Sequence, residues 1–595
     1  MSTVTYETHE HDVIVIGAGG AGLRAAIEAS NLGLSVGLIC KSLLGKAHTV
    51  MAEGGVAAAM ATVDQDDSWQ THFYDTMNGG KMMNNWRMAQ LHAQQAPDRV
   101  KELQEWGALF DRTKSGDFLQ RDFGGHQFRR LCHVGDRTGL EMIRTLQDKG
   151  VHMGIEVYME CAITRLLKDG DQIAGAFGYF RPDGRFVMYK AKAVILACGG
   201  LGRAYKVTSN SWECTGDGHA LGYEAGAELV DMEFVQFHPT GMVWPPGVAG
   251  LLVTEAVRGE GGKLTNKDGE RIMTKYDPDR MELSTRDVVA RAIYTEVKEG
   301  RGTPHGGCFL DVSYKPAETV IRKLPSMYHQ FKELANVDIT KEAMEVGPTT
   351  HYAMGGVKVD ADTGMTCVPG LFAAGECSGG MHGGNRLGGN SLSDLIVFGR
   401  LAGLGAAQYV KGIAKAPAIN QTVVDDAIKE MTDPFERTTT ETAYDVHAEL
   451  QDSMQMNVGI FRTEDDLQLG LANIQKYKER ASKVVAKGGR AFNPGWHLTR
   501  ELKNMLAVSE AIASAAILRK ESRGAHSRLD FKDPSEEQAQ VNYVVKRGDD
   551  GNAIVTPVPK AAMPADLQKI LGEQKDLQPQ REENKKTRLA QTAKE

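Results

Sequence analysis

The first forty residues of the chain alternate between short apolar runs and one glycine-rich turn. Residues 13–16 form an apolar run typical of a buried strand, residues 23–32 have the apolar spacing of a helix, and residues 35–40 form a second apolar run. The turn between the first two reads Gly17-Ala-Gly-Gly-Ala-Gly22. A strand, a G-x-G-x-x-G turn, a helix and a strand in this order predict a βαβ unit that binds a dinucleotide, with its pyrophosphate at the helix N-terminus.

Similar glycine-rich turns follow strand-like runs far downstream. They lie after residues 193–197, at residues 215–218, and at residues 375–389 after the run 370–374. Glycine supplies 66 of the 595 residues, which is above the usual ~7%. Backbone that approaches one extended cofactor explains these clusters. We therefore expect an α/β fold with a discontinuous Rossmann-type domain, residues 1–240 and 345–405, and an inserted capping domain, residues 241–344.

The pattern changes after residue 405. Residues 423–431, 463–481 and 498–520 have helical apolar spacing, which predicts a helical domain over 406–535. The alternating segment 541–545 indicates a small terminal sheet in a C-terminal region, residues 536–595. The last 22 residues are rich in charge and contain only two leucines, so we expect a solvated or partner-bound arm.

Composition and charge exclude several classes of protein. Lysine and arginine total 69 and aspartate and glutamate 77, a net charge of −8 that argues against nucleic-acid binding. The eight cysteines are scattered without a C-x-x-C pair, so no zinc, iron–sulfur or c-type haem motif is present and free thiols are expected. No apolar stretch approaches the ~18–20 residues of a membrane span. No signal peptide is visible, so the sequence predicts a cytoplasmic protein whose membrane link comes through partners.

Two features concern the cofactor directly. An acidic residue usually ends the second strand to hold the ribose, but residues 36–42 contain none, so Lys41 or Ser42 is expected to hold it. His48 follows this strand, where an isoalloxazine ring would lie if the dinucleotide were FAD. From its position His48 is either a packing residue or a covalent flavin anchor.

Several histidines and arginines lie in distinctive loops. His238 precedes a proline, which predicts a turn, and Glu255 and Arg258 stand one helical turn apart. Arg286 begins a predicted helix, while His351 and Arg386 lie beside glycine pairs. Each alone is more typical of structure than of function. Together they supply cations and neutral donors that suit a small dianion.

Long motifs in a fixed order identify a family. They are AHTVMAEGG, DRTG, FHPTG, TEAVRGEGG, RDVVARA, HYAMGG, GGNRLGGNSL and ESRGAHSR, within residues 10–535. With these motifs the chain resembles the flavoprotein subunit of succinate dehydrogenase, in the family it shares with fumarate reductase. The resemblance implies succinate oxidation to fumarate, with fumarate reduction as the alternative direction.

The resemblance also implies a role for each matching residue. His48 would bond covalently to the 8α-methyl group of FAD. The substrate carboxylates would be bound by His238, Thr254, His351 and Arg386. Arg286 would exchange the substrate proton with the help of Glu255 and Arg258, although the residues alone favour a histidine as the base because arginine's pKa is above ~12. The implied cofactor-binding residues are Gly17, Gly19, Gly20, Gly22, Lys41, Ser42, His48, Thr49, Gly54, Gly55, Gly199, Asp217, Glu376, Arg386, Ser391 and Leu392.

The same resemblance implies partners and a location. Because the chain has no cluster-binding cysteine motif, an iron–sulfur subunit would take the electrons, with membrane anchor subunits beyond it. The expected location is peripheral, on the cytoplasmic face of the inner (plasma) membrane. No metal site and no nucleic-acid partner are expected.

Two positions depart from the family pattern. Relatives commonly carry glutamine where this chain has Glu53, and a carboxylate beside the ring would lower the flavin potential by opposing the anionic reduced form. The segment 42–47 lacks the Arg-Ser that often precedes the linked histidine. Three alternatives remain: L-aspartate oxidase, which lacks the covalent histidine; an RNA-modifying FAD protein, which predicts a basic face and cysteine chemistry; and a flavin-binding assembly protein without turnover.

Overall fold

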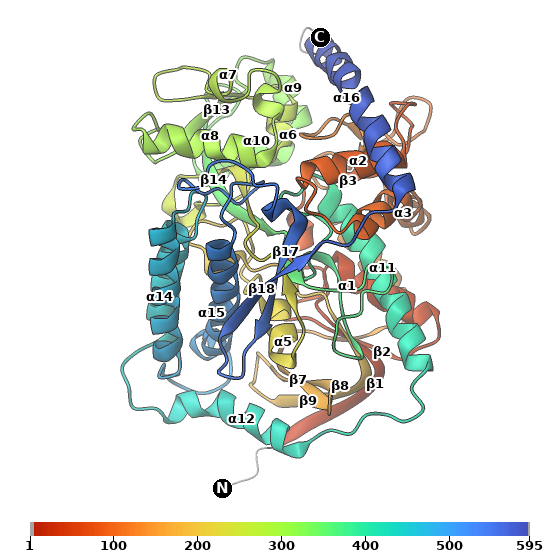
Figure 1. Cartoon of the computed structure of the whole chain (residues 1–595), viewed down its shortest axis with the longest axis vertical. Helices are drawn as coiled ribbons and strands as arrows, with labels where there is room; N and C mark the ends of the chain where they lie inside the picture. The colour runs from red at the N-terminus through yellow and green to blue at the C-terminus, as the bar shows by residue number, and fades with distance from the viewer. Residues whose placement is uncertain (1–4, 593–595) are drawn as a thin grey trace.

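The structure is a computed structural model that describes residues 5–592, and Figure 1 shows its course. The predicted arm's last residues, 593–595, lie outside the described part of the chain. A seven-stranded sheet has the order β6-β2-β1-β9-β8-β7, and β16 pairs with β9. Its strands are β1 (Tyr6–Ile16), β2 (Val36–Ile39), β6 (Glu156–Tyr158), β7 (Cys161–Asp169), β8 (Gln172–Phe180), β9 (Phe186–Leu196) and β16 (Leu371–Ala373).

Strand β1 explains why the N-terminal run is apolar without alternation. It pairs in parallel with β2 and β9 and is covered on both faces. Val13 and Val15 pack toward α1 (Gly20–Asn31) and α11 (Asn390–Lys411), whereas Ile14 and Ile16 belong to a second core cluster with α5 (Asp217–Ala225) and α15 (Pro494–Leu518). The predicted βαβ unit is confirmed. Helices α3 (Trp86–Glu105) and α4 (Thr138–His152) extend the first layer.

The inserted capping domain forms the upper left of Figure 1. Its sheet has the order β11-β14-β13-β12. The strands are β11 (Val235–Met242), β12 (Lys263–Thr265), β13 (Cys308–Asp311) and β14 (Met344–Ala353). The helices are α6 (Ala256–Gly259), α7 (Met273–Tyr276), α8 (Arg286–Lys298), α9 (Ala317–Lys323) and α10 (Pro325–Leu334). The turn predicted at His238 is wrong: the segment stays in β11, and the proline is absorbed by a register irregularity between His238 and Gly241.

The helical region matches the apolar spacing of the sequence. It contains α12 (Gln421–Glu436), α13 (Ala443–Asn457), α14 (Glu464–Ala481) and α15. The predicted terminal sheet is present, and it is shared with the cofactor-binding domain in the order β15-β10-β17-β18. Its strands are β10 (Leu229–Val230), β15 (Gly356–Val357), β17 (Val541–Arg547) and β18 (Ala553–Pro559).

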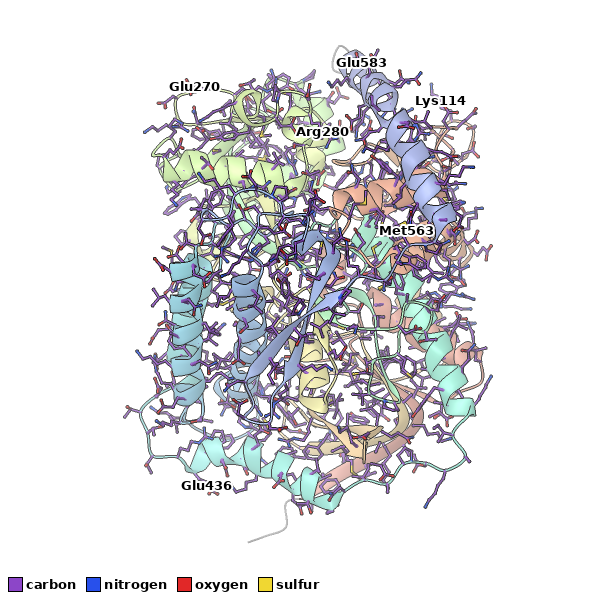
Figure 2. The ribbon with its side chains drawn as sticks, in the orientation of Figure 1. Lys114, Glu270, Arg280, Glu436, Met563 and Glu583 are labelled. Atoms are coloured by element: carbon purple, nitrogen blue, oxygen red, sulfur yellow. The ribbon has the colours of Figure 1, made fainter. Side chains whose placement is uncertain are left out.

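The predicted solvated or partner-bound arm is wrong for the described part of the tail. Residues 565–592 form α16 (Ala565–Thr592), which lies against α2 (Trp69–Gly79) and reaches the capping domain (Figure 1). Leu567 is buried beside Phe73 and Met77, close to where Figure 2 labels Met563. The charged residues that suggested an arm instead contact this chain: Arg280 pairs with Glu582 at 2.5 Å.

Short elements complete the fold. They are β3 (Val56–Ala57), β4 (Gln120–Arg121) and β5 (Leu131–Cys132), with the 3-10 turns η1 (His48–Met51), η2 (Gly202–Ala204), η3 (Pro246–Val248), η4 (Met281–Leu283), η5 (Gly375–Cys377) and η6 (Gln538–Gln540). Between residues 5 and 592, every helix is too short or too polar to span a bilayer.

Candidate active site

One cavity runs from the turn after β1 to the β11–β14 sheet of the capping domain. It encloses about 1680 Å³, including its opening to solvent, which exceeds the ~300–1,000 Å³ of an ordinary ligand pocket. Of the residues expected to bind cofactor or substrate or to act in catalysis, all but Gly22 and Arg258 line it. Gly22 instead allows close packing, and Arg258 lies behind Glu255.

The cofactor end of the cavity is shaped by backbone. Gly17 has a φ of +111°, and a Cβ there would lie 2.1 Å from the Ala197 carbonyl oxygen. Helix α1 begins at Gly20, whose N–H donates to the Thr49 hydroxyl at 3.3 Å. A glycine turn that leads into a helix N-terminus is the cradle a pyrophosphate requires, so these residues fit a dinucleotide.

A carboxylate reaches the end of β2 from elsewhere in the chain. Lys41 donates to the Thr215 hydroxyl and to Asp217, both at 2.8 Å, and lies 3.2 Å from Glu501. Burial alone would lower the pKa of Lys41, but Asp217 and Glu501 raise it above its usual value. Asp217 also accepts from Asn504. Helix α5 therefore supplies at this edge the acidic group that β2 lacks, beside Lys41 and Ser42.

His48 is held in a defined orientation at the middle of the cavity. The Ser211 N–H donates to its Nδ1 at 3.3 Å, which leaves Nε2 for another bond. Burial lowers the pKa of His48, opposed by Glu213, so the ring is neutral at pH 7 and its nitrogen can act as a nucleophile.

Glu53 does not carry the charge that the sequence suggested. Burial, and next the charge of Asp136, raise the pKa of Glu53 to about 8, while Thr254 and Arg121 act in the opposite direction. The side chain is thus mostly protonated at pH 7. A neutral carboxyl resembles the glutamine of relatives, so the expected lowering of the flavin potential at neutral pH is corrected.

Neutral histidines and buried arginines meet at the substrate end. The rings of His238 and His351 lie 5.1 Å apart, and the Ser209 hydroxyl contacts His351 Nδ1 at 2.8 Å. Burial lowers the pKa of both histidines, aided for His238 by Arg286. Burial and Arg286 also lower the pKa of Arg386 to about 9, so Arg386 remains a cation at neutral pH. Such a set can bind a dicarboxylate.

Gln236 connects the two arginines and was missed by the sequence analysis. Its Oε1 accepts from Arg286 Nη1 at 3.4 Å and from Arg386 Nη2 at 3.1 Å. Its amide nitrogen donates to Asn385 and to the Arg386 carbonyl. Recognition of the strand would have found it, because alternation places Gln236 two residues before His238 on one face.

A chain of ion pairs leads away from the substrate end. Arg286 Nε donates to Glu255 Oε2 at 2.9 Å, and Arg258 Nη2 lies 3.5 Å from the same oxygen. Burial would raise the pKa of Glu255, but Arg258 and Arg286 hold it below its usual value. The structure therefore brings together the three residues that the resemblance assigned to proton exchange.

Backbone groups brace this chain at both ends. The Gly124 N–H donates to Glu255 Oε1 at 2.8 Å, and Arg258 Nη1 donates to the Glu282 carbonyl at 2.6 Å. Neither contact has a signal in the sequence, because each depends on how a distant loop packs.

A glycine cradle for a dinucleotide and a dianion site in one cavity define a flavin-dependent oxidoreductase. A family described as "FAD binding domain" matches residues 12–392, and one described as "Fumarate reductase flavoprotein C-term" matches residues 447–569. The chain belongs to the family of succinate dehydrogenase and fumarate reductase flavoproteins.

Individual relatives carry both names. A fumarate reductase (CoM/CoB) flavoprotein chain of Methanothermobacter marburgensis is 46% identical over 88% of this chain and 95% of that protein. The succinate dehydrogenase flavoprotein subunit of Coxiella burnetii is 39% identical over 92% and 96%. Among solved structures, Mycobacterium smegmatis Sdh1 in complex with UQ1 has a TM-score of 0.85 and 57% identity over 94% of this chain and 95% of that chain. E. coli quinol fumarate reductase FrdA has a TM-score of 0.88 and 34% identity over 93% and 99%.

Proposed function

We propose that this flavoprotein oxidises succinate to fumarate. The observation that carries the proposal is the Arg286–Glu255 ion pair of 2.9 Å at the wall of the cavity that His238, His351 and Arg386 also line. This arrangement offers a dianion site and a proton exit side by side. The 57% identity to Mycobacterium smegmatis Sdh1 supports the direction.

Each residue has a separate task in the proposed mechanism. Arg386, His238, His351 and Thr254 bind the two carboxylates and fix the carbon chain. FAD, when bound, accepts the hydride equivalent that leaves one methylene carbon. Arg286 takes the proton from the other methylene carbon, and Glu255 and Arg258 pass it toward solvent. The two electrons and two protons of the oxidation are thus accounted for.

The same cavity suggests how FAD is held. The glycines Gly17, Gly19 and Gly20 cradle the pyrophosphate, while Gly22 allows the helix to pack closely. Asp217, Lys41 and Ser42 lie toward the ribose, and His48 Nε2 forms the covalent bond to the ring. The remaining cofactor contacts come from Thr49, Gly54, Gly55, Gly199, Glu376, Arg386, Ser391 and Leu392.

Electrons then leave through partners. The chain has no cysteine motif for a cluster, so we propose that they pass to an iron–sulfur subunit, with membrane anchor subunits beyond it. This places the protein at the cytoplasmic face of the inner (plasma) membrane, held there by its partners.

The reverse reaction is the second candidate. The Methanothermobacter marburgensis relative, at 46% identity, is named as part of a fumarate reductase. All the proposed residues serve either direction, because a catalyst acts on both directions of one equilibrium.

Two assays of the intact complex from its own host test the proposal. Succinate oxidation with an artificial acceptor should exceed fumarate reduction with a reduced dye at matched driving force. A higher fumarate reduction rate would assign the reverse direction, and no turnover of either would refute both. Ultraviolet fluorescence of the denatured band should show covalent flavin, and His48→Ala should abolish that signal while FAD stays bound.

A further inference from the structure

Helix α16 contacts the active-site relay at one remove. The matching C-terminal family ends at residue 569, so nearly all of α16 lies beyond it. In Figure 1 the helix crosses from α2 to the capping domain. Figure 2 labels Glu583 on α16 near Arg280 of the capping domain, and the neighbouring Glu582 pairs with that arginine.

Lys585 makes the deepest polar contact of this helix. Its ammonium donates to the Phe123 carbonyl at 3.1 Å and to the His126 carbonyl at 2.6 Å. Asp122 lies 3.8 Å away. Two carbonyls that flank Gly124 and Gly125 are thus fixed by one cation, which would be costly to bury without such partners.

The loop that Lys585 holds is the one that braces Glu255. Gly124 lies between the two carbonyls, and its N–H donates to Glu255 Oε1 at 2.8 Å. The space around it is narrow: a Cβ on Gly124 would lie 2.8 Å from that oxygen and 3.1 Å from the Ser284 carbonyl. A small shift of the loop therefore changes the geometry of the Glu255 carboxylate.

The same helix also touches the segment at the far end of the relay. Glu582 pairs with Arg280 at 2.5 Å and Lys586 with Asp279 at 3.2 Å. Two residues further on, the Glu282 carbonyl accepts from Arg258. One helix thus contacts both backbone segments that hold the Glu255–Arg258 pair.

We propose that α16 is a positioning element for the proton relay, and that Lys585 fixes the Gly124 N–H against Glu255. This inference rests on the proposed function, since it assigns α16 a part in succinate oxidation. Lys585 is a positioning residue, because it reaches the substrate only through Gly124, Glu255 and Arg286.

The test compares Lys585→Met with Lys575→Met in the intact complex, with rates expressed per bound flavin. Lys575 is exposed on the same helix and serves as the matched control. Lys585→Met should lower kcat for succinate about five- to tenfold, as expected for lost hydrogen bonds near reacting groups. The KM for succinate should change less than about twofold, because His238, His351 and Arg386 lie on other segments. Lys585→Arg, which can donate to both carbonyls, should restore more than half of kcat, while Lys575→Met should behave as wild type.

Hydrogen–deuterium exchange gives a readout that does not depend on turnover. The peptide over residues 119–131 should exchange faster in Lys585→Met than in wild type or Lys575→Met. Unchanged kcat, a raised KM with unchanged kcat, or unchanged exchange of this peptide would overturn the proposal. A wild-type complex that fails to oxidise succinate would refute the proposed function instead, and the exchange difference would still report the Lys585 contact.

Discussion

At its cofactor end the cavity is lined mostly by backbone, whereas at its substrate end it is lined by buried charged side chains. The first end comes from a strand, a turn and a helix that follow one another along the chain. The second is assembled from β11, α6, α8, β14 and the loop before α11. The difference teaches that the two ends should fail differently: added atoms damage the first, and lost charges or hydrogen bonds damage the second.

Removal of the proposed proton carrier should have the largest effect. Arg286→Gln should lower kcat about 10²–10⁴-fold, the usual contribution of a positioned acid or base. Bound FAD and the thermal midpoint should stay near wild type, because the cofactor end does not depend on this charge. Lys298→Gln, an exposed residue at the end of the same helix, is the control. Wild-type turnover in Arg286→Gln would remove this residue from the proton path.

An added methyl group at the other end should produce the opposite profile. Gly17→Ala combines an unfavourable φ of +111° with a Cβ 2.1 Å from a carbonyl oxygen, for a cost of about 2–6 kcal/mol. FAD content and thermal midpoint should fall together, and the flavin-loaded fraction should turn over near the wild-type rate.

A matched glycine separates strain from collision. Gly33 also has a positive φ of +84°, but nothing lies within 4 Å of its Cβ position. Gly33→Ala should therefore cost only about 1–3 kcal/mol and leave FAD content unchanged. If both variants lose FAD equally, backbone conformation rather than close approach governs this end.

The same contrast explains what the sequence could predict. The βαβ unit was predictable because its pattern is local, and the long motifs placed most cavity residues in advance. Gln236 was missed because its segment resembled a proline turn, whereas neighbouring strand β14 holds it in β11. The tail was misjudged because its charges find partners far away in sequence, such as the carbonyls that bind Lys585. Such pairings depend on tertiary packing, which no local pattern encodes.

Gln236 allows a smaller and more selective test of the substrate end. Gln236→Leu removes the acceptor shared by Arg286 and Arg386 and leaves these donors without it. The KM for succinate should rise about tenfold, within the range for a lost buried hydrogen bond, and kcat should fall less than in Arg286→Gln. Gln236→Glu keeps the shape but adds a negative charge, so it should weaken dianion binding further. A lower KM in Gln236→Glu would show that charge does not control this end.

Glu53 should show the smallest effect at neutral pH, since it is a side chain near the backbone-lined end that carries little charge there. Its pKa is raised by burial from 4.5 to about 8, so the folded protein binds this proton more tightly than the unfolded chain. Stability therefore falls, relative to Glu53→Gln, as pH rises from about 4.5 to about 8, with an upper limit of about 5 kcal/mol at about 1.4 kcal/mol per unit. The flavin midpoint potential should match in the two proteins at pH 6–7 and be lower in wild type at pH 9, where the carboxylate is charged. Parallel unfolding midpoints from pH 5 to 9 would mean that Glu53 is ionised throughout, and the wild-type potential should then lie below that of the variant at every pH.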